Sequence, residues 1–317
     1  MSAAWRLLGD VGGTNVRFGR SQADGILTDC QSWPVDDFGG FEQAVGRYLS
    51  ELPPDLQFTS AAVAGAGRVQ PHAIEITNTD WRITRDGVEG LLGGDVAVRL
   101  LNDLEAIAFA LPFLGEGEVS WLDQVRAPAE RCGRMLTVNV GTGFGSASVI
   151  TCDGELTACP AESGHMLLGA VSDEEIALFN AGGLARITVE DALSGDGIQW
   201  LYRAVTRARG EPMRDTDVEK RRFDFENTDA TTSQTRRWFG DFLARTASNL
   251  TLAAAAWDGV LLTGSVATAW ANGADVSRFR SEFTGSGKMR HMLAQVPLGV
   301  IAHDWPAFLG MAHLNVE

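Results

Sequence analysis

The sequence predicts an α/β protein built from two related halves, and two observations support this prediction. The chain repeats itself once: at an offset of 129 residues, eight of the 26 positions from Trp5 to Cys30 are identical to their counterparts in the second copy. Each copy also contains an apolar strand, a tight glycine turn, a second strand and an Asp-Gly hairpin signal. Solenoid repeats are much shorter, so we expect two α/β halves that face each other across a cleft.

The first half begins with a three-stranded antiparallel meander from Trp5 to about Trp33. Apolar residues at i, i+3 and i+4 mark the helices that follow, and short apolar runs mark the strands. In order, these elements are a helix over Gly40–Leu52 that Pro53 stops, a strand over Thr59–Ala64, a hairpin partner over His72–Thr77, a helix over Arg85–Leu92, a strand over Asp95–Leu101 and a helix that opens at Asn102–Glu105 and ends near Pro112.

The second half starts near Met135, after a link punctuated by Gly and Pro, and its meander ends at Cys159-Pro160. Beyond the meander, capping residues mark where helices begin and glycines mark where they end. The expected elements are helices over Ser172–Asn180 and Thr188–Leu193, a helix from Ser194 to Arg209, a long helix over Arg236–Trp257, a strand over Val260–Thr263, a helix over Val266–Trp270, a strand over Leu298–Ala302 and a terminal helix over Ala307–Leu314.

Composition and charge argue against two classes of partner. A formal net charge of -15 and a pI near 4.8 disfavour nucleic acid and anionic membrane surfaces. The chain has no 18-residue apolar run and no basic and apolar leader before the first strand, which leads us to expect a cytoplasmic protein. The cysteines lack close Cys-x-x-Cys pairing, so we expect buried free thiols at Cys30, Cys132, Cys152 and Cys159.

The two glycine turns differ from the common nucleotide-binding loops. A Rossmann or Walker loop leads from a strand into a helix, whereas the chain continues as a strand after Gly12-Gly13-Thr14 and after Gly141-Thr142-Gly143. Backbone N–H groups of the two turns, with the Thr14 and Thr142 hydroxyls, could hold the phosphates of one nucleotide. Either turn taken alone also fits a plain tight turn.

Asp103 follows a buried strand at the point where a helix begins. Phosphoryl transfer to an alcohol needs a carboxylate that accepts the hydroxyl proton, and a strand end holds such a group rigidly. The alternative is structural, because Asn102-x-x-Glu105 fits a capping box and leaves Asp103 as an ordinary first-turn acid. The residues by themselves leave both interpretations open.

Five motifs, in order along the chain, resemble those of the bacterial glucokinase family: Gly9–Arg17, Leu101–Ala106, Gly141–Gly145, Glu162–His165 and Leu262–Ser265. The family belongs to the hexokinase, actin and Hsp70 ATPase superfamily. The resemblance therefore implies a two-lobed ribonuclease H-like fold, in which each lobe is a mixed sheet with flanking helices and the active site lies in the interlobe cleft. The implied domains are residues 1–111, completed by a C-terminal helix over 303–317, and residues 112–302. The chain lacks the zinc motif of ROK sugar kinases, which favours the non-ROK branch.

The resemblance also implies an activity and its residues. It implies a cytoplasmic homodimer that uses ATP and Mg²⁺ to phosphorylate glucose to glucose 6-phosphate, the first step of glycolysis, with Asp103 as the catalytic base. The implied sugar-binding residues are Asn78, Asn102, Asp103, Glu162, His165 and Glu190. The implied ATP-binding residues are Asp10, which orients Mg²⁺ through water, and Gly12, Gly13, Thr14, Asn15, Gly141, Thr142, Gly143, Gly264 and Ser265.

Several alternatives remain open at this stage. Asn78 also fits a simple Asx turn, and Glu190 fits an ordinary helix N-terminal charge. Glu162-x-x-His165 could be half of a di-metal site, which needs a second such motif that the chain lacks. The same fold could phosphorylate another hexose or serve a sugar-sensing regulator. Ser163 and the stretch from Ser265 to Ala267 depart from the family pattern and bear on sugar and nucleotide preference.

Overall fold

The computed structural model describes residues 4–77, 79–126, 132–184, 186–212 and 223–316. The chain forms two compact units. The first comprises Met1–Gly115, Gly154–Pro160 and His303–Glu317, and the second comprises Glu116–Asp153 and Ala161–Ala302. Within the described ranges, no helix combines the length and the apolar character that a membrane span needs.

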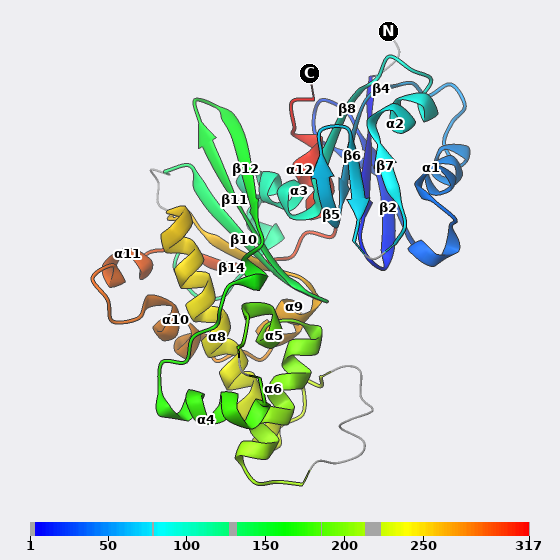
Figure 1. The fold of residues 1–317 in the computed structure, drawn as a ribbon. Helices are drawn as coiled ribbons and strands as arrows, with labels where there is room; N and C mark the ends of the chain where they lie inside the picture. Colours follow the sequence, from blue (N-terminus) through cyan, green and yellow to red (C-terminus); the bar gives the residue numbers. More distant parts are fainter. Residues whose placement is uncertain (1–3, 78, 127–131, 185, 213–222, 317) are drawn as a thin grey trace. The chain divides into compact units, whose positions relative to one another are not determined.

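The first unit is built on a five-stranded sheet with the order β3-β2-β1-β4-β8 (Figure 1). Strands β1, β4 and β8 run parallel, and β2 and β3 join them as an antiparallel meander. The strands are β1 (Trp5–Val11), β2 (Asn15–Ser21), β3 (Leu27–Pro34), β4 (Phe58–Gly65) and β8 (Ala97–Asn102); a separate small sheet holds β5 (Gly67–Gln70), β6 (Ala73–Ile76) and β7 (Arg82–Thr84).

The second sheet repeats this order as β12-β11-β10-β13-β14 and adds β9 at its edge. Its strands are β9 (Val119–Trp121), β10 (Arg134–Val140), β11 (Phe144–Cys152), β12 (Glu155–Ala161), β13 (Val260–Thr263) and β14 (Leu298–Ile301). The offset of 129 residues places β1 on β10 from end to end, and β10, β13 and β14 are parallel, as β1, β4 and β8 are. The predicted duplication is therefore confirmed, and it extends beyond the meander to two further strands.

The two copies differ at their turns. At the second Asp-Gly hairpin, both Asp153 and Gly154 have positive φ, as a two-residue primed turn requires, whereas only Gly25 does in the first copy. The glycine turns also differ by one residue, because Val11 pairs with Val16 but Val140 pairs with Phe144. The repeat is thus one of topology, with local turn geometry set separately in each half.

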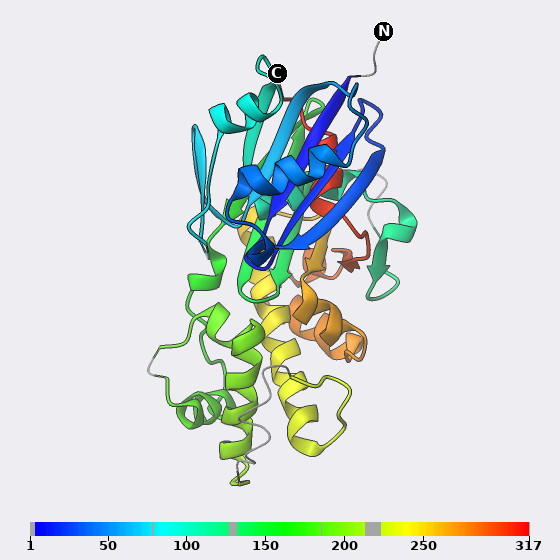
Figure 2. The same ribbon diagram turned by 90° about the vertical axis from the view of Figure 1, so that its right-hand side faces the viewer.

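Helices cover the first sheet. Helix α1 (Phe41–Ser50) lies across one face of the sheet (Figure 2), and its Phe41 and Tyr48 rings pack on Phe18 with centroids 5.7 and 5.5 Å away. Helix α12 (Pro306–Ala312) packs against α3 (Asp103–Ala110), so the C-terminus completes this unit (Figure 1). The other helices of the unit are α2 (Arg85–Leu91) and the 3₁₀ helices η1 (Val35–Asp37) and η2 (Leu111–Phe113).

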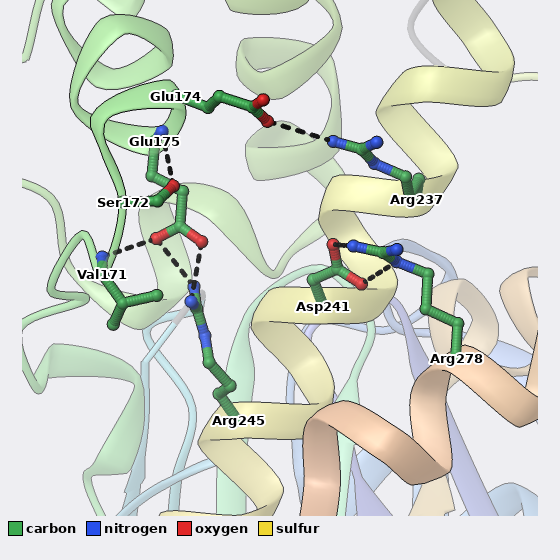
Figure 3. Close-up of polar contacts among 8 residues, drawn as sticks. All are labelled: Val171, Ser172, Glu174, Glu175, Arg237, Asp241, Arg245 and Arg278. Atoms are coloured by element: carbon green, nitrogen blue, oxygen red, sulfur yellow. Dashed lines mark hydrogen bonds and ion pairs between the residues drawn. The ribbon is translucent and has the colours of Figure 1, made fainter. Parts of the chain in front are cut away.

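The helices of the second unit surround α8 (Ala230–Ala254), which buries Phe239 and Phe242. Two ion pairs reach from α8 to its neighbours (Figure 3): Arg245 bonds Glu175 of α4, and Asp241 bonds Arg278 of α10, with shortest N···O distances of 2.7 Å in both cases. The helices are α4 (Asp173–Gly182), α5 (Val189–Ala192), α6 (Gly195–Ala208), α9 (Ser265–Ala271), α10 (Val276–Thr284) and α11 (Arg290–Leu293), with the 3₁₀ helices η3 (Glu116–Glu118) and η4 (Ser163–His165).

Several expectations from the sequence were wrong or incomplete. Helix α8 begins at Ala230 rather than Arg236, because Asp229 caps it and its first buried face consists of threonines, which carry no apolar signal. Strand β9 lies in the segment interpreted as a link, and β5, β7, α10 and α11 were not predicted. Strand β6 was expected to form a hairpin with β4 but pairs with β5 and β7 instead, because the chain reverses within residues 67–84 to form its own small sheet. All four cysteines are free as expected, but Cys132, Cys152 and Cys159 are exposed and only Cys30 is partly buried.

Candidate active site

The first glycine turn joins β1 to β2 and is open at its tip. The Gly12 N–H donates to the Asn15 carbonyl at 2.9 Å, and Gly13 and Thr14 are exposed. A Cβ placed on Gly12 would meet a single atom within 4 Å, the Asn15 oxygen at 3.4 Å. The fold itself therefore tolerates a side chain at Gly12, and the glycine leaves space that a ligand could use.

Asp10 and Arg17 face each other directly beneath this turn. They are paired residues of β1 and β2, and the Arg17 Nη1 atom lies 2.7 Å from the Asp10 Oδ2 atom. Asp10 is only 7% exposed, so the guanidinium compensates a nearly buried carboxylate. Arg17 was assigned no role from the sequence alone. The hairpin spacing across the turn was the signal that could have identified it as the partner of Asp10.

The register of the first sheet places Asp103 at the same edge as this turn. Val11 of β1 pairs with Gly65 of β4, and Gly65 pairs with Asn102 of β8. Because neighbouring strands are about 4.8 Å apart, the ends of β1 and β8 lie about 10 Å from each other along the edge. The proposed base and the first glycine turn thus come from strand ends that meet at one edge.

The predicted capping box at the start of α3 is confirmed. Asn102 Oδ1 accepts hydrogen bonds from the N–H groups of Leu104 at 3.0 Å and Glu105 at 3.4 Å, and Glu105 Oε2 accepts one from the Asn102 N–H at 3.3 Å. Asp103, half-buried, is the first residue of the helix. Since the Asn102 oxygen is committed to the cap, its amide NH₂ is the group that can donate to a sugar hydroxyl.

Burial raises the pKa of Glu105, and this effect outweighs the bond from the Asn102 N–H and the nearby Arg99 guanidinium, which both lower it. Arg99 lies 3.7 Å from the Glu105 carboxylate. The cap that fixes the position of Asp103 therefore includes a carboxylate held in an unfavourable environment.

The second glycine turn is held by the start of α6. The Gly141 N–H donates to the Gly143 carbonyl at 3.0 Å, and the Gly195 N–H donates to the Gly141 carbonyl at 2.8 Å. Thr142 is exposed at the tip, as Thr14 is in the first turn. The N-terminus of a 14-residue helix thus abuts the turn, a feature that the sequence analysis did not include in the site.

Gly264 joins the strand β13 to helix α9 beside this turn. Asn139 of β10 pairs with Thr263, and a Cβ on Gly264 would collide with the Val140 carbonyl oxygen and the Asn139 side chain. Its φ of 92° is also one that other residues rarely adopt. The structure therefore brings together the predicted ATP-binding residues of the second unit, namely Gly141, Thr142, Gly143, Gly264 and Ser265.

Glu190 connects the second glycine turn to η4. Its Oε2 atom accepts a 2.7 Å hydrogen bond from the Phe144 N–H, directly after the turn, and its carboxylate also lies against Gly164. The departure at Ser163 has a local explanation: its hydroxyl is buried and forms a 2.8 Å hydrogen bond with the Ser146 hydroxyl. The serine at this position thus links η4 to β11 through a side-chain hydrogen bond.

Glu162 and His165 lie at either end of η4 and face solvent. Their side chains are 94% and 71% exposed, with the His165 Nε2 atom 4.0 Å from the Glu162 carboxylate. Both groups are free to rearrange around a ligand. Asn78, the remaining predicted sugar-binding residue, lies outside the described residues.

The carboxylates present fit a magnesium ion that is held largely by its substrate. Among the residues described, no group of three or more His, Cys, Asp or Glu side chains could hold a metal. Mg²⁺ commonly uses one or two carboxylates together with phosphate oxygens and water. Asp10, next to the first glycine turn, could supply such a carboxylate beside a bound triphosphate.

A duplicated sheet of this topology, with a glycine turn after the first strand of each copy, is typical of the actin and hexokinase fold. Glucokinase relatives indicate that this chain is a sugar kinase, a phosphotransferase that acts on a hydroxyl group. The comparisons narrow the class. The family model described as Glucokinase matches residues 7–317, and the chain belongs to this family. The sequence is 30% identical to a glucokinase of Caulobacter vibrioides over 96% of this chain and 93% of that protein.

Solved structures share the fold. A glucokinase from an Antarctic psychrotroph superimposes with a TM-score of 0.83 at 24% identity, covering 98% of both chains. A ROK family glucokinase from Streptomyces griseus, solved in complex with glucose and AMPPNP, gives a TM-score of 0.63 at 16% identity over 98% of both chains. The predicted fold class is confirmed.

Proposed function

We propose that this protein transfers the γ-phosphoryl group of ATP to the 6-hydroxyl of glucose with the aid of Mg²⁺. The observation that carries the proposal is the register Val11–Gly65–Asn102, which brings a glycine turn and a fixed carboxylate to one edge of a sheet. Membership of the glucokinase family and the complex of the Streptomyces griseus relative with glucose and AMPPNP support the choice of substrates.

In this proposal Asp103 accepts the proton of the 6-hydroxyl. The sugar oxygen bonds to the γ-phosphorus as the bond between that phosphorus and the β–γ bridging oxygen breaks, so the products are glucose 6-phosphate and ADP. The capping box fixes the backbone at Asp103, which limits the positions available to its carboxylate.

The nucleotide would be bound by backbone and hydroxyl groups of the two glycine turns. Gly12, Gly13, Thr14 and Asn15 belong to the first turn, and Gly141, Thr142 and Gly143 to the second, which α6 supports with its N-terminus. A helix N-terminus favours negative charge. Gly264 and Ser265 would lie against the adenosine, and Asp10 would orient Mg²⁺ through water; the ion would neutralise the phosphate charge that develops during transfer.

The sugar would be bound by hydrogen bonds from several polar side chains. Asn102 would donate from its amide, while Glu162, His165 and Glu190 would accept from or donate to the other hydroxyls, with Asn78 as a further candidate. Because a buried hydroxyl without a partner is costly, a ring of such groups discriminates between hexoses. A homodimer and a place in glycolysis rest on the family resemblance alone, and sedimentation velocity would test the homodimer. A cytoplasmic location rests on the resemblance and on the hydropathy of the sequence.

The test replaces the proposed base and a matched first-turn acid. Asp103→Asn should lower kcat by about two to four orders of magnitude, the usual effect of removing a positioned base, while glucose affinity measured by calorimetry largely remains. Asp86→Asn removes the exposed first-turn acid of α2 in the same unit and should leave kcat unchanged. If both variants retain activity within a few-fold of the parent, Asp103 is only a helix-terminal acid.

A hexose panel tests the substrate. We expect turnover of glucose to exceed that of mannose, fructose and glucosamine under the same conditions. Negligible turnover of glucose beside efficient turnover of another hexose would reject glucose but keep the reaction class. No turnover of any hexose, with intact binding of glucose, would favour the sugar-sensing alternative.

A further inference from the structure

A pocket of about 400 Å³ lies in the second unit among α8, α9 and α10, formed by residues that the proposed reaction does not use. Its charged lining comprises Arg236, Arg237 and Arg278 with Asp241 and Asp275. Three guanidinium groups face two carboxylates in a chain whose net charge is -15. The pocket is therefore locally cationic within an acidic protein.

Both carboxylates of the pocket are already engaged. Asp241 forms a two-pronged ion pair with Arg278, with both N···O distances at 2.7 Å (Figure 3). Asp275 caps α10 by accepting a 3.0 Å bond from the Arg278 N–H. Arg278 is thus neutralised by Asp241, so the positive charge of the pocket resides mainly on Arg236 and Arg237.

Neither of these two arginines is paired with a carboxylate as closely as Arg278 is, and the Arg237 guanidinium also lies 4.5 Å from the centroid of the Trp238 ring. Arg237 reaches toward Glu174 of α4 (Figure 3), but the gap is 3.7 Å and the Glu174 side chain is 79% exposed. Such exposed pairs contribute little free energy. Arg236 donates to the Gly273 carbonyl, a neutral acceptor. A bound anion would take the place of the Glu174 carboxylate beside Arg237 and of the Gly273 carbonyl beside Arg236. It would form charge-assisted hydrogen bonds with both guanidinium groups.

The pocket has an apolar wall beneath its cationic rim. Trp270 and Phe279 are each only 3% exposed and line it. Two glycines make room: a Cβ on Gly240 would approach the Trp270 ring to 3.2 Å, and one on Gly273 would collide with the Arg236 guanidinium. The volume is well above that of a bare phosphate ion, so the shape suits an anionic group with a compact organic body.

We propose that this pocket binds a phosphate monoester of a small sugar or polyol. Guanidinium groups match phosphate oxygens in paired hydrogen bonds, and two of them can share one dianionic phosphate. None of the residues that line the pocket is a proposed nucleotide-binding residue, although Ser265 and Trp270 belong to the same helix, α9. At a rise of 1.5 Å per residue, about 7 Å of helix separates them.

Isothermal titration with ribose 5-phosphate tests the proposal, with the full chain saturated with glucose and AMPPNP so that the proposed active site is filled. We expect saturable binding of ribose 5-phosphate, and none of ribose. The double variant Arg236→Gln, Arg237→Gln should weaken binding about tenfold or more, the effect of losing one charge-assisted hydrogen bond. Arg290→Gln, an exposed arginine on α11, removes charge outside the pocket and should leave the affinity unchanged.

Four outcomes would overturn the proposal: affinity for inorganic phosphate or citrate equal to that for ribose 5-phosphate, equal affinity for ribose, loss of binding in the presence of glucose and AMPPNP, or equal weakening by Arg290→Gln. Circular dichroism and a melting curve confirm that the double variant folds, and Arg237→Gln alone provides a milder second variant, with a smaller loss of affinity. Because the readout is binding, the result does not depend on whether the protein phosphorylates glucose.

Discussion

The guanidinium of Arg17 lies 2.7 Å from the carboxylate of Asp10, on paired residues of β1 and β2. Asp10 is the proposed magnesium-orienting group, so its charge is balanced by a protein cation before any metal is present. Arg17 has a side chain that is 39% exposed, and it can therefore move while Asp10 remains in place. The pair places a cation against a nearly buried carboxylate beneath the first glycine turn.

Replacing Arg17 should destabilise the first unit because the Asp10 carboxylate then loses its charged partner. We expect Arg17→Gln to lower the free energy of unfolding by about 1–3 kcal/mol, the cost of an uncompensated charged acceptor, measured by urea denaturation. Glu51→Gln, which breaks an exposed pair with Arg47 and leaves the Arg47 guanidinium over the Trp33 ring, is the control and should cost about 0.5 kcal/mol or less. Equal effects of the two variants would mean that the Asp10–Arg17 pair is of no special importance.

Gly264 should be intolerant of any side chain. Gly264→Ala combines an unfavourable φ with a collision against the Val140 carbonyl. Gly285→Ala isolates the first effect, since Gly285 also has positive φ but a Cβ there meets nothing within 4 Å. We expect Gly285→Ala to cost about 1 kcal/mol, and Gly264→Ala to cost more and also to weaken binding of AMPPNP. Comparable melting temperatures for the two variants would contradict the collision.

Two adjacent glutamates of α4 should differ sharply in their contribution to stability (Figure 3). Glu175, whose side chain is 4% exposed, is bonded to Arg245, whereas Glu174 is 79% exposed and lies 3.7 Å from Arg237. Glu175→Gln should cost about 2–4 kcal/mol, because Arg245 is left without its partner. Glu174→Gln should change stability by less than about 0.5 kcal/mol. Chemical denaturation distinguishes the two, and similar values would show that the Arg245 pair is solvent-screened.

The capping carboxylate Glu105 should make stability depend on pH in a specific direction. Because the pKa of Glu105 is raised in the folded state, folding favours the protonated carboxyl group. The resulting stabilisation is present below the unfolded pKa of about 4.3 and is lost as the pH rises through the folded pKa. Glu105→Gln does not titrate and can still complete the cap. The stability of this variant relative to the parent should therefore increase between pH 4 and pH 7, measured by unfolding at both pH values. A constant or falling difference would contradict the raised pKa.

Local signals in the sequence were sufficient for most elements. The Asn102 and Thr188 capping boxes, the Pro306 helix start and the Gly183 helix end all depend on residues a few positions apart, and the structure contains each of them. The internal repeat predicted the second meander from the first because both copies specify the same strand order. The elements missed include the helices α10 and α11 and the strands β5, β7 and β9. Strand β9 has three residues and is stabilised by pairing with the distant β14.

The site was only partly predictable, because some of its residues are recognised from contiguous sequence and others only from contacts between distant segments. The sequence by itself determined the glycine turns, the strand-to-helix position of Asp103 and the family resemblance, since each resides in contiguous residues. Only the tertiary structure decided that Val11, Gly65 and Asn102 align across one sheet, that Arg17 is the partner of Asp10, and that Gly195 supports Gly141. Those relationships depend on strand register and helix packing, which bring together residues that are distant in sequence and that no local pattern connects.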